Sequence, residues 1–367
     1  MNNNKILLLI PAPSALGGVT TYINILKKEL TVNTDYLIRG NRTYPFRKSE
    51  FLNLIRFLKD IALFINALIF HRYKIIQTNT SFDKMGILRD YFYVIISKLF
   101  FKKIIVFYHG WDYDFVNKVD RRYLKLFKFV FFRANAFVVL SSEFKDTFIR
   151  WGFKKPIYIE TTIVDKELVK NISEESVIKK YAQMADGHLS LLYLARIEKT
   201  KGIYIALHAY VILKQRYPDL SMTIAGNGLE LANIKTEIDK NNIKDVLVKG
   251  HIDKDEIANA FTTSSVYIFP SYREGMPTSV LEAMAFGLPI ITRQVGGLKD
   301  FFTNEKMGYI TESLDPSDFA EIIDQLLQNP GKMKDIAQYN YIYAREHFIS
   351  DIVVKRIESI YKILISD

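Results

Sequence analysis

The sequence predicts an α/β protein built from two doubly wound domains, each with a parallel sheet. Short apolar runs alternate with longer amphipathic stretches along the whole chain, and this pattern restarts near residue 186. Strand–helix alternation of this kind is typical of parallel sheets that are covered by helices on both faces. The chain has 367 residues, and a single hydrophobic core stops growing at roughly 250–300 residues, which favours two domains.

The expected strands are short apolar runs, and amphipathic stretches that indicate helices separate most of them. In the first series the expected strands cover residues 5–10, 74–79, 103–109, 136–141 and 156–161. In the second series they cover residues 189–196, 220–228, 245–251, 266–271 and 288–293. The expected helices include residues 20–30, 141–152, 203–218, 230–242 and 255–264.

The boundary between the two domains is expected where the alternation is interrupted. Residues 173–188 are polar and charged, so this segment is the predicted linker. We therefore predict a first domain over residues 1–180 and a second domain over residues 181–345. Residues 346–367 continue a helix-like stretch to the end of the chain, and we expect this last helix to pack back on the first domain.

Composition and charge narrow the class of protein. The chain is 49% hydrophobic and has no cysteine, which excludes a disulfide framework and a thiolate metal site. The net charge of +10 is uneven, because residues 1–185 carry +14 and residues 186–367 carry −4. This asymmetry indicates an anionic partner for the first half of the chain, either nucleic acid or an anionic membrane surface.

A membrane surface is the preferred anionic partner. In residues 51–70 and 121–133, basic side chains are interleaved with many Phe, Leu and Ile residues, as in segments that lie on a lipid surface. Ordinary helices with solvated basic side chains give the same pattern, so both interpretations stay open. The longest apolar stretch without a charge, residues 61–70, is shorter than the roughly 20 residues of a membrane span. We expect a cytoplasmic protein, peripheral on the inner face of the membrane, that binds no nucleic acid.

Several expected strands end in residues that suit an anionic ligand. Arg196 and Lys201 follow one strand, and their cationic groups match phosphate oxygens, although a solvated basic turn is the plain alternative. Gly17 and Gly18 follow the first strand and precede a helix, where backbone amides can approach a ligand or simply form a connector. Gly226 ends another strand, but its surroundings lack the spacing of a dinucleotide-binding fingerprint.

The strand over residues 103–109 ends in His109, which can donate hydrogen bonds to a phosphate or a sugar, or can be a structural residue. Asp112 and Asp114 follow it, and paired carboxylates can hold a divalent metal. Because two aspartates are common in loops, this metal signal is weak.

The stretch "REGMPTSVLEAMAFGLPI", residues 273–290, has two glutamates eight positions apart. Glu274 lies in a strand-end loop, and Glu282 lies one turn into the helix that begins near residues 277–279. Ser279 and Glu282 have the spacing of a capping box, which is the structural interpretation of the second glutamate. The alternative is a ligand site, because a carboxylate has two acceptor oxygens for two neighbouring hydroxyls and the helix start offers free amides. Cations for a diphosphate and acceptors for hydroxyls together suit a nucleotide sugar.

Residues 270–297 resemble the Glu-x7-Glu signature of the family 4 retaining glycosyltransferases, which have the GT-B fold. The resemblance continues through residues 194–202, 223–230 and 246–271 in the expected order, and it is looser before residue 165. It implies two Rossmann-like domains facing a central cleft, with acceptor binding in the first domain and nucleotide-sugar binding in the second. Ala195 stands where the family usually has glycine, and residues 160–165 replace its usual Asn-Gly turn.

The resemblance also implies roles for individual residues. Arg196 and Lys201 would bind the donor diphosphate, Glu282 the donor ribose and Glu274 the transferred sugar, and His109 would contact the sugar or its phosphate. The remaining expected donor contacts are Gly17, Gly18, Gly226, Met276, Pro277, Thr278 and Ser279. No cofactor and no metal is expected.

The implied activity is transfer of a sugar, with retained configuration, from a nucleoside diphosphate sugar that is expected to be UDP-linked. The expected acceptor is lipid-linked or a polysaccharide, in cell-surface glycan synthesis, and a front-face mechanism without metal is favoured. Two alternatives stay open. One is a catalytically silent partner subunit that binds nucleotide sugar, and the other is a metal-dependent transferase that uses Asp112 and Asp114.

Overall fold

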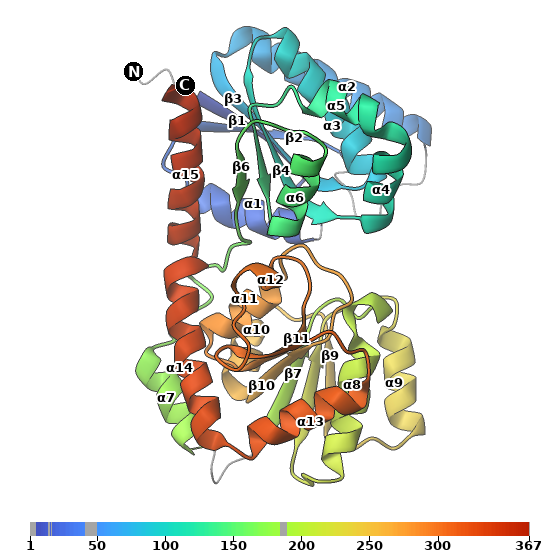
Figure 1. Ribbon diagram of the computed structural model, residues 1–367, viewed down its shortest axis with the longest axis vertical. Helices are drawn as coiled ribbons and strands as arrows, with labels where there is room; N and C mark the ends of the chain where they lie inside the picture. The colour runs from blue at the N-terminus through green and yellow to red at the C-terminus, as the bar shows by residue number, and fades with distance from the viewer. Residues whose placement is uncertain (1–4, 14, 16, 41–49, 184–188, 367) are drawn as a thin grey trace. The chain divides into compact units, whose positions relative to one another are not determined.

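The structure, a computed structural model, describes residues 5–13, 15, 17–40, 50–183 and 189–366. The chain divides into two compact units (Figure 1). Unit 1 comprises Met1–Ile163 together with Ser350–Asp367, and unit 2 comprises Val164–Ile349.

The described residues of unit 1 form a six-stranded parallel sheet of order β2-β1-β3-β4-β5-β6. Helix α1 packs against α15, and α3 packs against α2 and α5. The strands are β1 (Lys5–Ile10), β2 (Thr34–Ile38), β3 (Tyr73–Phe82), β4 (Lys103–Trp111), β5 (Ala136–Val139) and β6 (Ile157–Ile159). The helices are α1 (Gly18–Glu29), α2 (Glu50–Phe70), α3 (Lys84–Leu99), α4 (Tyr113–Lys118), η1 (Val119–Tyr123), α5 (Leu124–Phe131), α6 (Ser142–Arg150) and α15 (Ser350–Ser366).

The described residues of unit 2 form a second six-stranded parallel sheet, of order β12-β11-β10-β7-β8-β9. The strands are β7 (Ser190–Leu194), β8 (Ser221–Ala225), β9 (Val246–Gly250), β10 (Val266–Phe269), β11 (Ile290–Arg293) and β12 (Gly308–Thr311). The helices are α7 (Glu174–Gln183), η3 (Lys199–Lys201), α8 (Ile203–Lys214), α9 (Leu231–Lys240), α10 (Lys254–Thr263), α11 (Thr278–Ala285), α12 (Leu298–Phe301), α13 (Pro316–Leu327) and α14 (Pro330–His347).

The central strands of both units are continuous apolar runs because helices cover both faces of a doubly wound sheet. In β4 the side chains from Ile104 to Tyr108 are all fully buried, and in β10 those from Val266 to Phe269 are buried. The polar strand-end residues described below therefore follow rigid, fully packed elements.

The last helix of the chain, α15, belongs to unit 1. Its Glu358 carboxylate accepts hydrogen bonds from the backbone amide of Thr31 at 2.6 Å and from the Thr31 hydroxyl at 2.8 Å. Its Arg356 forms an ion pair with Glu160 at 2.9 Å. Residues more than 190 positions apart in the sequence are thus joined within one unit.

The boundary between the units is earlier than the sequence predicts. The expected boundary near residue 180 falls inside α7, which belongs to unit 2 and packs on α14. Val177 and Tyr181 of α7 are buried, and the Tyr181 hydroxyl donates to the backbone carbonyl of Ser265 at 2.8 Å. These contacts explain why the polar segment after residue 173 is not the boundary. Residues 184–188 of the predicted linker lie outside the described residues.

Candidate functional site: the strand ends of unit 2

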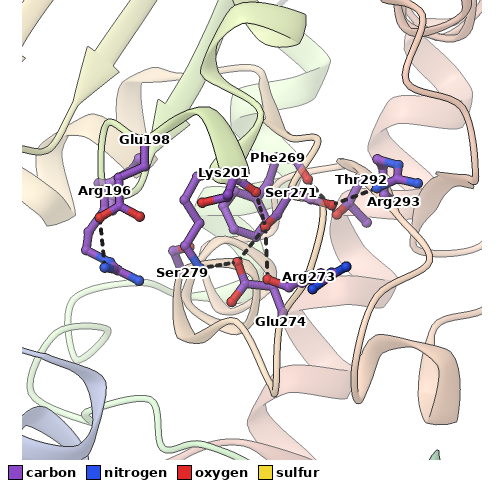
Figure 2. A network of polar contacts seen from close by, with 12 residues as sticks. Arg196, Glu198, Lys201, Phe269, Ser271, Arg273, Glu274, Ser279, Thr292 and Arg293 are labelled. Atoms are coloured by element: carbon purple, nitrogen blue, oxygen red, sulfur yellow. Dashed lines mark hydrogen bonds and ion pairs between the residues drawn. The ribbon is translucent and has the colours of Figure 1, made fainter. Parts of the chain in front are cut away.

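The strand ends of unit 2 bring Lys201 and Glu274 together (Figure 2). Lys201 ends η3, just after β7, and Glu274 follows β10. The Lys201 ammonium nitrogen lies 2.6 Å from Glu274 Oε1, and the two side chains are only 15% and 12% exposed. This pairing of a cation and a carboxylate from loops 73 positions apart is the centre of the candidate site.

Ser271 is a third residue of the candidate site, and it was not predicted from the sequence. Its side chain is fully buried, and its hydroxyl donates to Glu274 Oε1 at 2.7 Å. Both donors therefore reach the same carboxylate oxygen, and within the described part of the chain Oε2 is left for a ligand. The only sequence signal for Ser271 is its place at the end of an expected strand, three residues before Glu274.

The two loops that carry Lys201 and Glu274 pack tightly against each other. Gly202 has a φ of +76°, and a Cβ atom at this position would lie 2.1 Å from the backbone oxygen of Pro270. The backbone amide of Tyr272 donates to the Thr200 carbonyl at 2.9 Å. Only glycine permits this close approach, so Gly202 fixes the distance between the loops.

Arg196 also follows β7, but its side chain does not point toward the Lys201–Glu274 pair. Its side chain is 67% exposed, and its guanidinium donates to Glu198 Oε1 at 2.8 Å (Figure 2). The structure therefore does not bring Arg196 to the Lys201–Glu274 pair. An exposed ion pair contributes about 0–1 kcal/mol, so a polyanionic ligand can replace Glu198 as its partner.

Gly226 shapes the loop before Arg196. A Cβ atom on Gly226 would lie 1.8 Å from the Ala195 carbonyl oxygen, and its amide donates to the Gly250 carbonyl at 2.6 Å. The Gly226 amide already donates this hydrogen bond. Gly226 therefore contributes to the site by allowing the backbone at Ala195, just before Arg196, to pack closely against it.

The start of α11 offers free backbone amides beside Glu274. The N-cap residue is Pro277, whose carbonyl accepts from the amide of Val280 at 3.1 Å, so the amides of Thr278 and Ser279 precede the first intrahelical bond. Met276 is buried just before the helix. These amides and the positive end of the helix dipole suit an anionic group.

The structure contradicts the capping-box interpretation of Ser279 and Glu282. Pro277 is the N-cap residue of α11, and among the described residues no side chain caps this helix. The Ser279 hydroxyl instead accepts a hydrogen bond from the Tyr267 hydroxyl at 2.7 Å. Ser279 therefore lies inside the first turn of α11, and Glu282 takes no part in capping this helix.

Glu282 is partly buried, and among the described residues no hydrogen bond engages its carboxylate. Its pKa is raised to about 8, chiefly by burial and next by the Asp165 carboxylate, while the Lys254 ammonium opposes the shift. Asp165 and Lys254 pair with each other at 2.8 Å. A partly buried carboxyl that makes no hydrogen bond within the described residues is typical of a ligand-binding position.

Unit 1 carries the other expected ligand contacts. Gly17 is the N-cap of α1 with a φ of +142°, and a Cβ atom on Gly17 or Gly18 would meet none of the described residues within 4 Å, their chain neighbours apart. As far as the described residues go, neither glycine is closely packed. His109 lies near the end of β4, where its Nε2 is 3.0 Å from the Asn79 side-chain oxygen.

Asp112 has a structural role as the N-cap of α4. Its Oδ1 accepts from the backbone amides of Asp114 at 3.0 Å and Phe115 at 3.1 Å. Over the described ranges, no group of three or more His, Cys, Asp or Glu side chains is placed to hold a metal ion. The paired aspartates of the sequence are thus a helix cap and its neighbour.

Comparisons with known proteins indicate what kind of enzyme carries this site. Residues 176–343 match the family described as glycosyl transferases group 1. This match and the relatives below identify the chain as a glycosyltransferase. Glycosyl transferases of group 1 are the family 4 retaining hexosyltransferases. Over its whole length, this glycosyltransferase is 24% identical to the capsular polysaccharide biosynthesis glycosyltransferase CapM of Staphylococcus aureus, covering 99% of that protein.

A shorter match of this glycosyltransferase is to the amylovoran biosynthesis glycosyltransferase AmsK of Erwinia amylovora, with 30% identity over 38% of the chain and 36% of AmsK. Among solved structures, sucrose-phosphate synthase from Thermosynechococcus elongatus is similar with a TM-score of 0.77 and 19% identity, covering 99% of both chains. HepE of Anabaena in complex with UDP is similar with a TM-score of 0.72 and 17% identity, covering 98% of this chain and 99% of that one. The glycosyltransferase therefore has the GT-B fold that its sequence predicts.

Proposed function

We propose that this glycosyltransferase moves a sugar from a UDP-linked donor to a lipid-linked or polysaccharide acceptor in cell-surface glycan synthesis. The names of two relatives, CapM for capsular polysaccharide and AmsK for amylovoran, support the glycan. The HepE structures that contain UDP and UDP-glucose support the nucleotide. The observation that carries the proposal is the shielded Lys201–Glu274 pair beside the open start of α11.

The diphosphate of the donor is assigned to the cations and amides of this site. Lys201 keeps two ammonium hydrogens beyond the one it gives to Glu274, and the Arg196 guanidinium is 67% exposed in its ion pair with Glu198. The backbone from Met276 to Ser279, including Pro277 and Thr278, supplies the helix-start amides. Fixed positive groups of this kind stabilise a charged leaving group most where water is excluded.

The hydroxyl groups of the donor are assigned to the two glutamates. Glu274 offers Oε2 to the transferred sugar, because Lys201 and Ser271 both occupy Oε1. Glu282 offers a carboxyl group, which makes no hydrogen bond within the described residues, to the two hydroxyls of the ribose. Gly17, Gly18 and His109 are the proposed ligand contacts of unit 1, and Gly226 acts through the loop that it supports.

We propose a front-face mechanism that needs no metal. The departing diphosphate takes the proton of the acceptor hydroxyl on the same face of the sugar, and the configuration is retained. Lys201 and Arg196 stabilise the negative charge that develops on the leaving group, which is the largest electrostatic demand of the reaction.

Release of UDP from a panel of UDP-sugars, measured without acceptor, tests the activity and separates it from a silent partner subunit. We expect slow hydrolysis of one donor, unchanged in EDTA, and a raised melting temperature with that donor because it binds only the folded protein. Absence of both hydrolysis and binding across UDP-, GDP- and ADP-sugars would refute the proposal.

A lipid surface is the proposed location of the acceptor. In unit 1, helix α3 packs against both α2 and α5, and all three helices expose large apolar side chains. On the described residues these are Phe51, Leu52, Leu54, Ile55, Leu58, Leu63, Ile69, Phe70, Met85, Leu88, Phe92, Leu99, Leu126 and Phe129. Exposed basic residues accompany them, including Lys59, Arg72, Lys84, Lys125 and Arg133. We call these apolar and basic residues the α2–α3–α5 surface.

An anionic bilayer is the occupant that the α2–α3–α5 surface suits best. Apolar side chains insert at the headgroup boundary, and each Lys or Arg near an anionic leaflet adds about 1 kcal/mol. Across the described residues, no helix has the length and apolarity that spanning a bilayer requires.

A further inference from the structure

Helices α2 and α3 of unit 1 lie side by side (Figure 1), and a small cavity lies between them. Its volume is ≈ 50 Å³. Gly40, which follows β2, forms part of its wall, so the cavity lies at the carboxyl end of that strand. The polar residues that line it are Asn53, Arg56, Asp60, Arg89 and Tyr93.

The size of this cavity suits one small chemical group. Roughly 10–15 Å³ of such space holds one water molecule, so ≈ 50 Å³ holds about four oxygen atoms. Pockets for whole small-molecule ligands commonly measure about 300–1,000 Å³. A phosphate group, with its four oxygens around one phosphorus atom, therefore matches the cavity, whereas a sugar ring or a nucleobase does not.

Tyr93 has a hydroxyl group without a partner at this cavity. Its side chain is fully buried, and its hydroxyl makes no hydrogen bond in the described part of the chain. Burial raises the pKa of Tyr93, the Arg39 guanidinium lowers it and the Asp60 carboxylate raises it, so the hydroxyl lies near charged groups. A buried hydroxyl without a partner destabilises the folded protein, and an acceptor atom in the cavity would relieve this cost.

Arg89 has further donors that the protein leaves unused. Its Nε donates to Asp90 Oδ1 at 3.0 Å, and its Nη2 donates to the Thr80 hydroxyl at 3.4 Å. Within the described residues its Nη1 makes no hydrogen bond. A Cβ atom on Gly40 would lie 4.0 Å from this Nη1, which places the nitrogen beside the wall of the cavity. Both of its hydrogens are therefore open to a ligand.

The charged residues of the cavity favour an anion. Two guanidinium groups, those of Arg56 and Arg89, line it together with one carboxylate, that of Asp60. Asp60 Oδ2 already accepts a hydrogen bond from the Gly40 amide at 2.9 Å. Guanidinium donors match the geometry of phosphate oxygens better than any other side chain does.

The cavity also borders the α2–α3–α5 surface. Phe57 of α2 lines the cavity, and its ring meets the ring of Phe92 with centroids 5.3 Å apart. Phe92 belongs to the α2–α3–α5 surface and is 42% exposed. A phosphate group in the cavity would therefore lie next to the apolar side chains that suit the chains of a lipid.

We propose that Arg56, Arg89 and Tyr93 bind a phosphate group in this cavity. The same chemistry has two sources, the headgroup of a lipid on the α2–α3–α5 surface and a free phosphate ion. The cavity shares no residue with the proposed donor site. The inference thus goes beyond the proposed function and is tested without turnover.

Hydrogen exchange with and without inorganic phosphate locates the site. Phosphate is added in the low millimolar range, and chloride keeps the ionic strength constant. We expect slower exchange in peptides of α2 and α3, and unchanged exchange in α13 of unit 2. Lys201→Ala should show the same slowing in α2 and α3, because this substitution lies in the donor site, where phosphate can also bind.

Vesicles test the lipid as the source. Phosphatidic acid carries a terminal phosphate, whereas the phosphate of phosphatidylglycerol is an internal diester, and the two kinds of vesicle are adjusted to equal surface charge. If the source is a lipid, we expect about tenfold tighter binding to phosphatidic acid. Arg89→Gln should lose this preference. Arg121→Gln on η1, an exposed arginine that does not line the cavity, should keep it.

The two measurements together decide the proposal. Slower exchange with phosphate but no preference among vesicles would identify free phosphate as the ligand. A preference for phosphatidic acid that Arg89→Gln removes would identify a lipid headgroup. Neither slower exchange in α2 and α3 nor a preference among vesicles would overturn the inference, and it would leave the proposed transfer of sugar untouched.

Tyr93→Phe provides a variant that we expect to fold even if Arg89→Gln does not. It should raise the melting temperature without phosphate, because it removes a buried hydroxyl that has no partner. It should also weaken binding of phosphate or phosphatidic acid about tenfold or more. Tyr91→Phe, the same change at a half-buried position of α3 that does not line the cavity, should alter neither. A lower melting temperature with unchanged ligand binding in Tyr93→Phe would contradict the inference.

Discussion

Lys201 is the single residue on which the proposed chemistry depends most. We expect Lys201→Ala to lower kcat by about 10²–10³, because removing one preorganised donor to a developing anion costs about 3–4 kcal/mol. Initial rates of UDP release measure the effect, and circular dichroism with a thermal melt confirms that the variant folds.

Lys199 provides the matched control for this substitution. It lies in the same turn, but its side chain is 71% exposed and its nearest carboxylate, on Glu230, is 4.0 Å away. Lys199→Ala should keep most of the activity. Near-normal turnover by Lys201→Ala would contradict the assignment of the leaving-group site.

Glu282 predicts a pH dependence of folding stability. Its pKa of about 8 in the folded protein is above the ordinary value for a glutamate. The folded state therefore binds more protons than the unfolded state between about pH 4.5 and pH 8, so this residue lowers stability as the pH rises through that window. We expect Glu282→Gln to be more stable than wild type by about 1–3 kcal/mol at pH 8.5, with the difference shrinking toward pH 5.5.

Urea unfolding at several pH values measures this difference. Glu321→Gln, an exposed substitution on α13, serves as the control and should change stability little at any pH. A Glu282→Gln curve that runs parallel to the wild-type curve would show that the carboxyl is charged throughout.

The strands and helices that position the site were largely predictable from the sequence. Each predicted strand falls on an observed one, because the central strands of doubly wound sheets are continuous apolar runs bounded by turns. The pattern missed β2 and β12, which lie at the sheet edges and are mostly half-buried, so their apolar signal is weaker.

The site was predictable in residue type but not in geometry. That Lys201 and Glu274 lie close together agrees with the expectation for residues at strand ends, but their ion pair with each other was not predicted. The position of Arg196, the cap at Pro277 and the buried Ser271 hydroxyl depend on loop backbones. Loop conformation is set by close contacts such as the one at Gly202, and a sequence pattern does not encode those contacts.

Helix α2 is the element on which we expect membrane binding to depend. Leu54 and Leu58 are 54% and 57% exposed on it. Changing both to Glu should lower the partition onto vesicles rich in phosphatidylglycerol by about tenfold or more, because burial of two leucines is lost and two like charges are added. Co-sedimentation with vesicles measures the partition.

The control for this pair is Leu247→Glu on β9 of unit 2, which is 55% exposed and lies outside the α2–α3–α5 surface. It should leave the partition unchanged. Equal binding of the wild-type protein to neutral and anionic vesicles would rule out the electrostatic contribution of the basic side chains.

At the scale of the whole molecule, unit 1 depends on a helix that is distant in sequence. We expect a chain ending at Ile349 to lose the protection of β1 to β6 against hydrogen exchange, while β7 to β12 remain protected. The reason is the loss of the bonds of Arg356, Glu358 and Tyr361 to unit 1. Mass spectrometry of exchanged peptides separates the two units.

A synthetic peptide of residues 350–367 should restore protection to unit 1, and a scrambled peptide of equal composition should not. Unchanged protection of β1 to β6 in the shortened chain would mean that the sheet of unit 1 is stable without α15.

Because α15 belongs to unit 1, the order of translation also affects the order in which the two units can finish folding. The sheet of unit 1 is translated before unit 2, but α15, which completes unit 1, is translated after all of Val164–Ile349. At roughly 5–20 residues per second, that interval lasts about 10–40 s. During this time unit 2 can finish folding while unit 1 still lacks α15. Unit 1 is therefore completed after unit 2, although its synthesis begins earlier. A frameshift within the codons for Ser350–Ser366 would therefore damage unit 1.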